Sequence, residues 1–249
     1  MAKTILITGA SSGLGAEMAR QLAARGHDLA LCARRTERLD ELKAEITAAH
    51  PDTRVEVRAL DVDDHDAVFA VFRAFRTDFG TIDRVIVNAG IGKGAPLGTG
   101  RFDANRDTAV TNFVGALAQT EAALEVFRDQ GYGHLVMISS MSAARGLPKS
   151  GTTYAATKAG VAHLAEGVRT ELHGSRIKVS VIYPGYIRSE MNERVKKVPF
   201  IVSTEKGVAA IVDAVEKEKP RAQVPAWPWV PVGFALRHLP LPLARKLMG

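Results

Sequence analysis

The sequence lacks most of the features that mark secreted and membrane proteins. Only one of the 249 residues is a cysteine, so no disulfide can form within the chain, and we expect Cys32 in the apolar run Leu29 to Ala33 to be a buried core thiol. No apolar run approaches the roughly 18 residues that suggest a membrane span. Met1-Ala2-Lys3 leads straight into an apolar strand pattern, without a signal segment. These features predict a cytoplasmic protein in reducing surroundings.

Aromatic residues are also scarce, at 6% of the chain, and this bears on the meaning of its positive charge. The formal net charge of +6 is compatible with nucleic acid, an acidic carrier, anionic lipid or a charged cofactor. The basic residues are scattered without interleaved aromatics or a nucleic-acid-binding motif, so we expect no nucleic-acid partner. They include Arg34, Arg35, Arg38, Lys196, Lys197, Arg245 and Lys246. We also expect no metal site.

The order of apolar patterns predicts an α/β fold. With 46% hydrophobic residues the chain can bury a full core, and we expect one domain over residues 1–249. Apolar, β-branched runs alternate with stretches of helical period, which indicates a Rossmann-type, doubly wound parallel sheet of about seven strands flanked by helices. The expected strands are Thr4–Thr8, Asp28–Cys32, Arg54–Leu60, Arg84–Asn88, His134–Ser139, Lys178–Tyr183 and Gln223–Ala226. The expected helices are Gly13–Arg25, Arg35–His50, Asp64–Phe79, Asp103–Gln130, Tyr154–His173 and Thr204–Lys217.

A glycine-rich turn follows the first expected strand. The run Thr8-Gly9-Ala10-Ser11-Ser12-Gly13-Leu14-Gly15 leads directly into a helix. Gly9 suits a tight turn, Gly13 lets the backbone approach a pyrophosphate, and Gly15 lets the helix pack closely on the strand. The exposed N–H groups of the first helical turn attract an anion. The sequence therefore predicts a dinucleotide site here.

The end of the second expected strand indicates which dinucleotide. Sites for the unphosphorylated cofactor typically place an acid about 20 residues past the glycines. The strand instead runs into Ala33-Arg34-Arg35, and guanidinium groups suit a 2′-phosphate. We expect NADP(H) rather than NAD(H), with Arg34 as the lead contact and Ser12 or Arg35 assisting. The alternative is a pair of solvated arginines at a helix start, which is electrostatically unfavourable unless an anion is bound.

Tyr154 and Lys158 are the candidate catalytic pair. A spacing of four places both on one helical face, where a nearby ammonium favours the phenolate and lowers a tyrosine pKa from about 10. Ser140 closes the strand His134–Ser139, at the edge where a hydroxyl can reach a substrate oxygen. Ser139 and Ser142 are alternatives, and capping of backbone groups is the usual role of such serines.

Together these motifs resemble the classical short-chain dehydrogenase/reductase family over about residues 3–215. The motifs that carry the resemblance are the glycine run Thr8 to Gly15, Asn88-Ala89-Gly90, Asn112, Ser140, Tyr154-Ala155-Ala156-Thr157-Lys158 and Pro184-Gly185. It implies that Tyr154 exchanges a proton with the substrate oxygen, which Ser140 holds. It also implies that Lys158 binds the nicotinamide ribose and that Asn112 holds a water leading protons toward Lys158. Without the resemblance, Asn112 is a mid-helix amide on a polar face.

The resemblance implies further cofactor contacts. The whole turn of Gly9, Ser11, Ser12, Gly13, Leu14 and Gly15 would bind the cofactor, and Asn88, Ala89 and Gly90 would line the adenine ribose and steady the sheet. Asp61, with Val62 beside it, resembles the acid that contacts adenine; alternatively Asp61 or Asp63 is the N-cap of the next helix. After Pro184-Gly185, Ile187 would offer backbone atoms to the carboxamide, and Ser189 replaces the family's usual threonine.

Loops beyond the carboxyl ends of the strands are the expected walls of the site. They are Ile91 to Gly100 and Tyr183 to Ser203, and the substrate pocket would depend on Ile91 to Gly100, Gly146 to Thr153 and Val195 to Ser203. The connection from Ser140 to Tyr154 is one residue longer than in many relatives, near Leu147 to Thr153.

The segment 220–249 leaves the family's pattern. It contains Trp227, Trp229, Phe234, six prolines and the basic residues Arg237, Arg245 and Lys246. Three interpretations stay open: a lid over the substrate pocket, a dimer contact, or an aromatic and basic face on an anionic membrane. We expect a homodimer or homotetramer.

The predicted activity is NADP(H)-dependent interconversion of a carbonyl and an alcohol, on a small molecule that the apolar tail suggests is lipophilic. One alternative is a reductase of 3-oxoacyl thioesters on an acyl carrier protein or CoA. The other is a non-catalytic NADP(H)-binding regulatory or scaffold module.

Overall fold

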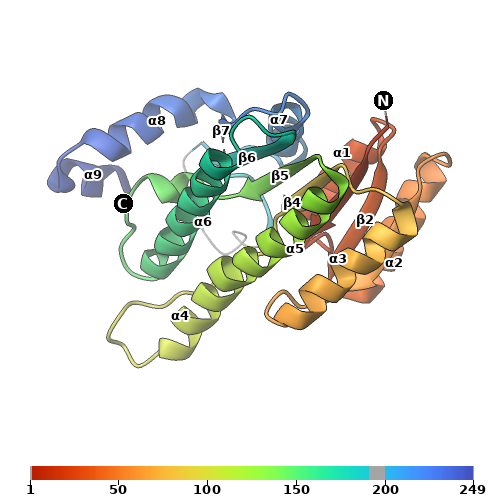
Figure 1. Cartoon of the computed structure of the whole chain (residues 1–249). Helices are drawn as coiled ribbons and strands as arrows, with labels where there is room; N and C mark the ends of the chain where they lie inside the picture. The colour runs from red at the N-terminus through yellow and green to blue at the C-terminus, as the bar shows by residue number, and fades with distance from the viewer. Residues whose placement is uncertain (1, 191–199, 249) are drawn as a thin grey trace.

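The computed structural model of the chain describes residues 2–190 and 200–248, and these form one parallel sheet of seven strands (Figure 1). The strand order is β3-β2-β1-β4-β5-β6-β7. Because the order reverses between β1 and β4, a crevice opens at the carboxyl ends of these strands, where ligands of such sheets bind. The strands are β1 (Thr4–Thr8), β2 (Asp28–Ala33), β3 (Val55–Ala59), β4 (Arg84–Val87), β5 (Gly133–Ile138), β6 (Ile177–Pro184) and β7 (Arg221–Val224).

Helices cover both faces of the sheet, which makes the fold Rossmann-like. The helical elements are α1 (Gly13–Ala23), α2 (Thr36–Ala49), α3 (His65–Phe79), α4 (Phe102–Ala109), the π-helical segment η1 (Val110–Val114), α5 (Gly115–Gln130), the short 3₁₀ segment η2 (Met141–Ala144), α6 (Gly151–Glu171), α7 (Thr204–Glu216), α8 (Ala226–His238) and α9 (Leu241–Met248). The front face in Figure 1 carries α3, α5 and α6, while α1, α2 and α7 cover the opposite face.

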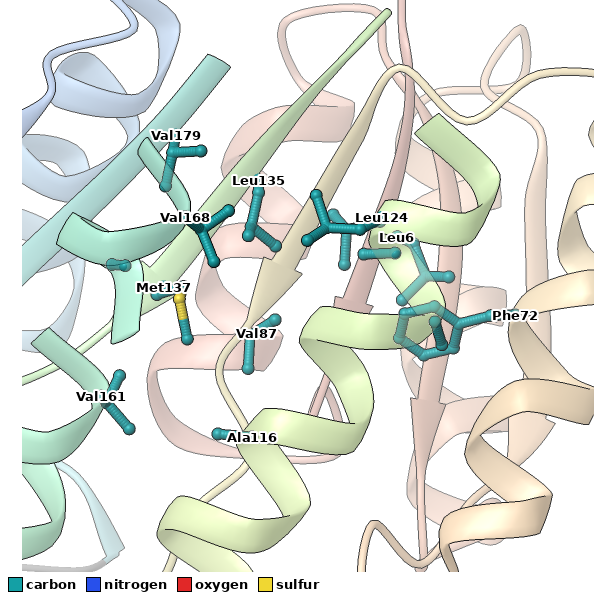
Figure 2. Close-up of a cluster of buried hydrophobic side chains, with 14 of the residues drawn as sticks. Leu6, Phe72, Val87, Ala116, Leu124, Leu135, Met137, Val161, Val168 and Val179 are labelled. Atoms are coloured by element: carbon teal, nitrogen blue, oxygen red, sulfur yellow. The ribbon is translucent and has the colours of Figure 1, made fainter. Parts of the chain in front are cut away.

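Alternation along the strands divides the core into two layers. In β1, Leu6 belongs to the layer under α3, α5 and α6, whereas Ile5 and Ile7 belong to the layer under α1, α2 and α7. Figure 2 shows Leu6 and Phe72 among the packed side chains of the first layer. Burial on both faces explains why the strands are almost continuously apolar in the sequence.

The seven strands and six long helical segments predicted from the sequence are confirmed, with ends shifted by a few residues. The helical run expected over Asp103–Gln130 is continuous from Phe102 to Gln130 but not uniformly α-helical, because the π-helical segment η1 lies between α4 and α5. Asn112 lies in η1, and both atoms of its amide bind the backbone of Ile91: the amide oxygen accepts from the Ile91 nitrogen at 2.7 Å, and Nδ2 donates to the carbonyl at 2.8 Å. π-segments of this kind often occur at functional positions.

One smaller expectation is also corrected, and the structure of the tail is added. The N-cap of α3 is Asp64, whose carboxylate accepts from the Ala67 nitrogen at 3.0 Å, and not Asp61 or Asp63. The helix begins at His65, one residue later than expected, so the capping position moves with it. The tail also forms two helices, although it contains six prolines. Trp227 has non-helical backbone angles, so the regular part of α8 starts at Pro228, where a missing N–H costs little.

A buried polar network ties the amino-terminal ends of the strands together. Arg84 on β4 is fully buried; its Nε donates to Nδ1 of His134 on β5 at 2.9 Å, and its Nη1 is paired with Glu216 at the end of α7. Burial, followed by the charge of Arg84, lowers the pKa of His134 to about 3. The ring is therefore neutral, and its Nε2 hydrogen is directed at the Ser180 hydroxyl, 2.8 Å away.

We expect Glu216→Gln to lower the free energy of unfolding by about 3–5 kcal/mol, because it leaves the Arg84 guanidinium buried without a counter-charge. Urea denaturation at neutral pH measures the loss. The matched control is Glu218→Gln, whose carboxylate forms a partly exposed pair with Lys3 at 3.5 Å and should change the free energy by less than about 1 kcal/mol. Equal effects of the two substitutions would contradict a structural role for the network.

Candidate active site

The glycine turn forms a close contact between β1 and α1. Gly9 and Gly13 have φ values of +64° and +55°, which other residues rarely adopt. A Cβ at Gly9 would lie 2.9 Å from the Cα of Ala89, and a Cβ at Gly15 would collide with the Gly9 carbonyl. The first turn of α1 therefore abuts the end of β1, which places a helix N-terminus, a general anion-binding feature, at the carboxyl edge of the sheet.

Arg35 crosses this turn. Its Nε donates to Ser11 Oγ at 3.3 Å and its Nη2 donates to Ser12 Oγ at 2.6 Å. The Glu190 carboxylate accepts from Arg35 at 3.2 Å and from Arg38 at 2.5 Å, and these arginines, Arg38 first, hold the Glu190 pKa below its usual value. Three arginines, Arg34, Arg35 and Arg38, thus gather at the start of α2.

Arg34 is oriented differently from Arg35. Its guanidinium lies 3.7 Å from the Asp61 carboxylate, and both side chains are largely exposed. The structure therefore brings together Arg34, which the sequence analysis expects at the 2′-phosphate, and Asp61, which it expects at the adenine. Val62, next to Asp61, is buried and packs at Gly115, the first residue of α5.

Asn88 and Ala89 hold the carboxyl ends of β1 and β4 together. The backbone nitrogens of Asn88 and Ala89 donate to the Thr8 hydroxyl at 3.0 and 3.1 Å, and Asn88 Nδ2 donates to the Thr8 carbonyl at 2.9 Å. Gly90 follows, and a Cβ there would lie 3.1 Å from the Asn112 amide oxygen and 3.5 Å from Lys158 Nζ. The lack of a side chain at Gly90 thus lets three segments meet.

Lys158 is buried at the carboxyl end of β5. Its ammonium donates to the Ile138 carbonyl at 2.9 Å and lies 5.9 Å from the centre of the Tyr154 ring. Burial lowers the pKa of Lys158 to about 8. Burial also raises the Tyr154 pKa, while a hydrogen bond with Ser140 opposes that rise and nearby Tyr186 adds to it. The pKa of Lys158 is therefore lowered while that of Tyr154 is raised, so the two values move apart.

The three serines at this edge have different surroundings. Ser139 donates to the Lys158 carbonyl at 2.8 Å, which ties β5 to α6. The Ser142 hydroxyl is buried without a hydrogen-bond partner among the described residues. Ser140 accepts from the Ser142 nitrogen at 3.1 Å and also interacts with the Tyr154 phenol. Of the three, Ser140 is the one that shares its hydroxyl with Tyr154.

Comparisons with known proteins show the family of the chain. Residues 3–199 match the family model described as short chain dehydrogenase. An uncharacterized oxidoreductase of Mycobacterium tuberculosis is 52% identical over 242 residues, which cover 97% of this chain and 96% of the relative. The chain belongs to the short-chain dehydrogenase/reductase family.

Solved structures of the family share the fold. A short chain dehydrogenase from Burkholderia cenocepacia in complex with NADP has a TM-score of 0.84 at 25% identity, over all of this chain and 98% of the other. A short chain dehydrogenase/reductase from Burkholderia phymatum in complex with NAD also has a TM-score of 0.84, at 21% identity, over 95% of this chain and 93% of the other. Both complexes hold nicotinamide dinucleotides.

The loop after β6 lies beside the glycine turn of this short-chain dehydrogenase. Ile187 is buried and forms a bridge with Val202, and Ser189 lies near Gly13. Pro184 is the last residue of β6, and a Cβ at Gly185 would overlap the indole of Trp229 on α8. Lys196, Lys197 and the part of the expected pocket wall at 195–199 lie outside the described residues.

Three residues near the site were not foreseen as contacts. Glu190 follows the expected cofactor loop, and nothing in its sequence context indicates that it reaches Arg35 and Arg38. Trp229 stacks edge-on against Tyr186, with ring centres 5.5 Å apart. The unusual tryptophan content of the tail was the available signal, but it does not reveal which surface the indole covers.

The pKa of Lys158 predicts how its burial affects stability. The folded-state value of about 8 lies below the ordinary 10.5. Between these values the unfolded chain keeps a proton that the folded protein has released, so the free energy of unfolding should rise with pH, by up to about 1.4 kcal/mol per pH unit. Lys158→Met should remove this rise. Urea denaturation across the window checks it, with exposed Lys178→Met as the control, and an unchanged slope in Lys158→Met would contradict the assignment.

Proposed function

We propose that the chain is an NADP(H)-dependent oxidoreductase that interconverts a carbonyl and an alcohol. The observation that carries the proposal is the meeting of Tyr154, Lys158 and Asn112 at the carboxyl ends of β4 and β5, next to the glycine turn. A cofactor-binding scaffold would need the turn but not this set of titratable side chains.

The glycine turn fits a dinucleotide, because the contacts at Gly9 and Gly15 leave no room for a Cβ and the first turn of α1 lies at the carboxyl edge of the sheet. Gly9, Ser11, Ser12, Gly13, Leu14 and Gly15 would hold the phosphates, with Asp61, Val62, Asn88, Ala89 and Gly90 on the adenosine side and Pro184, Gly185, Ile187 and Ser189 on the nicotinamide side. When bound, the nicotinamide supplies or accepts the hydride.

Tyr154 moves the proton. In reduction its phenol donates to the substrate oxygen, and the raised pKa keeps the phenol protonated near neutral pH. Ser140, which already interacts with the phenol, would hold the same oxygen. In oxidation the phenolate is required, and the positive charge of Lys158 stabilises it.

Lys158 and Asn112 prepare this step. The buried ammonium of Lys158 is oriented by the Ile138 carbonyl, which leaves other N–H donors for the ribose. Asn112 fixes the Ile91 backbone and approaches the Thr157 hydroxyl at 3.4 Å, so it orders the loop in front of Lys158. We propose that a water held by Asn112 carries protons toward Lys158.

The preference for NADP(H) is argued from charge. Arg34, Arg35 and Arg38 gather at the start of α2, where Glu190 and Asp61 are their ion-pair partners among the described residues. Arg35 already spans two hydroxyls of the phosphate-binding turn, and Arg34 is the more exposed guanidinium. A 2′-phosphate would accept bidentate hydrogen bonds from such groups.

Two substitutions test the cofactor preference. Arg34→Gln and Arg35→Gln should each weaken NADPH binding roughly tenfold or more, by loss of a charge-assisted contact, and leave NADH binding nearly unchanged. Titration of the cofactor's fluorescence measures both affinities. Arg73→Gln, on α3 in an exposed pair with Glu125, is the control for net charge. Equal losses of affinity for NADPH and for NADH would show that the arginines do not recognise the 2′-phosphate.

Tyr154→Phe tests the chemistry. We expect kcat for carbonyl reduction to fall by roughly 10²–10⁴-fold, the usual contribution of a general acid, with cofactor affinity retained. Steady-state kinetics with NADPH and a panel of carbonyl compounds measures the loss. Tyr132→Phe, outside the site in the turn before β5, is the matched control. Turnover by Tyr154→Phe at the rate of this control would refute the mechanism.

A further inference from the structure

The tail has two unlike sides. On its inner side Trp229 is 5% exposed and lies over Gly185, and Gly233 packs tightly on Met141 and Gln223. Arg145 donates to the carbonyls of Leu236 and Leu239 at the end of α8, at 3.1 and 2.6 Å. The inner side of α8 is thus an integral part of the fold around η2 and β7.

The outer side is apolar and has no cover. Trp227 is 79% exposed and Phe234 is 69% exposed, although both are large hydrophobic residues. A spacing of four places Val230 and Phe234 on one face of α8, and Trp227 lies just before the regular part of this helix. We call Trp227, Val230, Phe234, Leu241 and Leu243, all exposed, the tail face. Figure 1 shows that α8 and α9 form one end of the molecule, away from α2 and α3.

The charge of this segment indicates what would cover the tail face. From Lys219 to Gly249 the sequence contains no aspartate or glutamate, although the whole chain has 27 acidic residues. Arg237, His238 and Arg245 are exposed on α8 and α9. The basic residues of the segment are Lys219, Arg221, Arg237, Arg245 and Lys246. Two copies of such a segment would repel each other, so a second copy of this chain is a poor occupant, whereas anionic lipid offers the opposite charge.

We propose that the tail face docks on an anionic lipid surface. A helical segment with tryptophan, phenylalanine and leucine on one side and arginine beside them lies in the plane of the lipid headgroups and buries its apolar side below them. Within the described ranges, each helix is too short or too polar to cross a bilayer, so α8 and α9 lie on the membrane rather than through it.

Docking would also orient the candidate active site. Tyr186 and Phe200 are exposed and pack edge-on against Trp229, with ring centres 5.5 and 6.3 Å away. Tyr186 is near enough to Tyr154 to raise its pKa. Tyr186 therefore links Tyr154 to Trp229 on the inner side of α8, and the proposed lipid contact would lie on the outer side of the same helix.

Vesicle sedimentation tests the docking with the full chain, independently of catalysis. The probes are phosphatidylcholine vesicles with and without phosphatidylglycerol, each at low and at high salt. We expect binding to the anionic vesicles at low salt, release at high salt, and little binding to phosphatidylcholine alone. The chain has two tryptophans, and Trp227 is the exposed one, so its fluorescence should shift to the blue on binding.

Two double variants separate the apolar and the charged contributions. Trp227→Ser/Phe234→Ser should abolish sedimentation with anionic vesicles. Arg237→Gln/Arg245→Gln should weaken it about 25-fold, because each basic residue near the surface contributes roughly a fivefold factor. Controls elsewhere on the surface are Phe102→Ser, at a position 75% exposed on α4, and Arg73→Gln/Arg128→Gln. Thermal unfolding confirms that each variant is folded.

Several outcomes would overturn the proposal. They are equal binding of the wild-type chain to both kinds of vesicle, no binding to either, or tail variants that sediment like the controls. Light scattering coupled to size exclusion adds one more: if Trp227→Ser/Phe234→Ser converts a dimer to a monomer while lipid binding is unchanged, the tail face is an interface between copies of this chain.

Discussion

The burial of the Lys158 ammonium is the constraint on which the site is built. A cation in a place dry enough to lower its pKa to about 8 is costly, and the Ile138 carbonyl offsets only part of that cost. The site tolerates it because three segments meet there: the end of β5, the first turns of α6, and the Gly90 turn, which has no side chain to interfere. In the proposed function the charge must lie close to Tyr154 and away from water, so the destabilising feature would also be the functional one.

The two ends of the sheet differ: a polar network lies at the amino ends of the strands, and the candidate site lies at their carboxyl ends. At the amino end, Arg84, His134 and Glu216 join β4, β5 and α7 through a buried and a partly buried hydrogen bond. At the carboxyl end of the same strands, the turns are glycine-rich and charged groups are exposed to a crevice. Because β4 and β5 are buried and pair in parallel along their length, a network at one end helps to keep Gly90 and Ser140 in register at the other.

Most of the fold could be predicted from the sequence because its signals are local: alternating apolar runs, helical periods and a glycine turn after a strand. The meeting of Tyr154 with Lys158 was predictable for the same reason, since four residues on a helix fix their geometry. The π-segment at Asn112 was not, because it depends on hydrogen bonds to Ile91, twenty-one residues away in the chain. The contacts of Glu190 with Arg35 and Arg38 are longer-range still, and no periodicity encodes them.

The orientation of the tail, residues 220–249, also depends on long-range contacts that the sequence does not reveal. Its composition indicated an amphipathic segment, but only the packing of Trp229 on Gly185 shows which side faces inward. Arg145 then connects α8 to the segment that begins at Ser140, through the carbonyls of Leu236 and Leu239. Whatever holds the outer side of α8 therefore acts on the backbone that presents Ser140 to Tyr154. An occupant of that outer side that binds only the ordered form of α8 would stabilise that form by mass action and, through Arg145, the segment that carries Ser140.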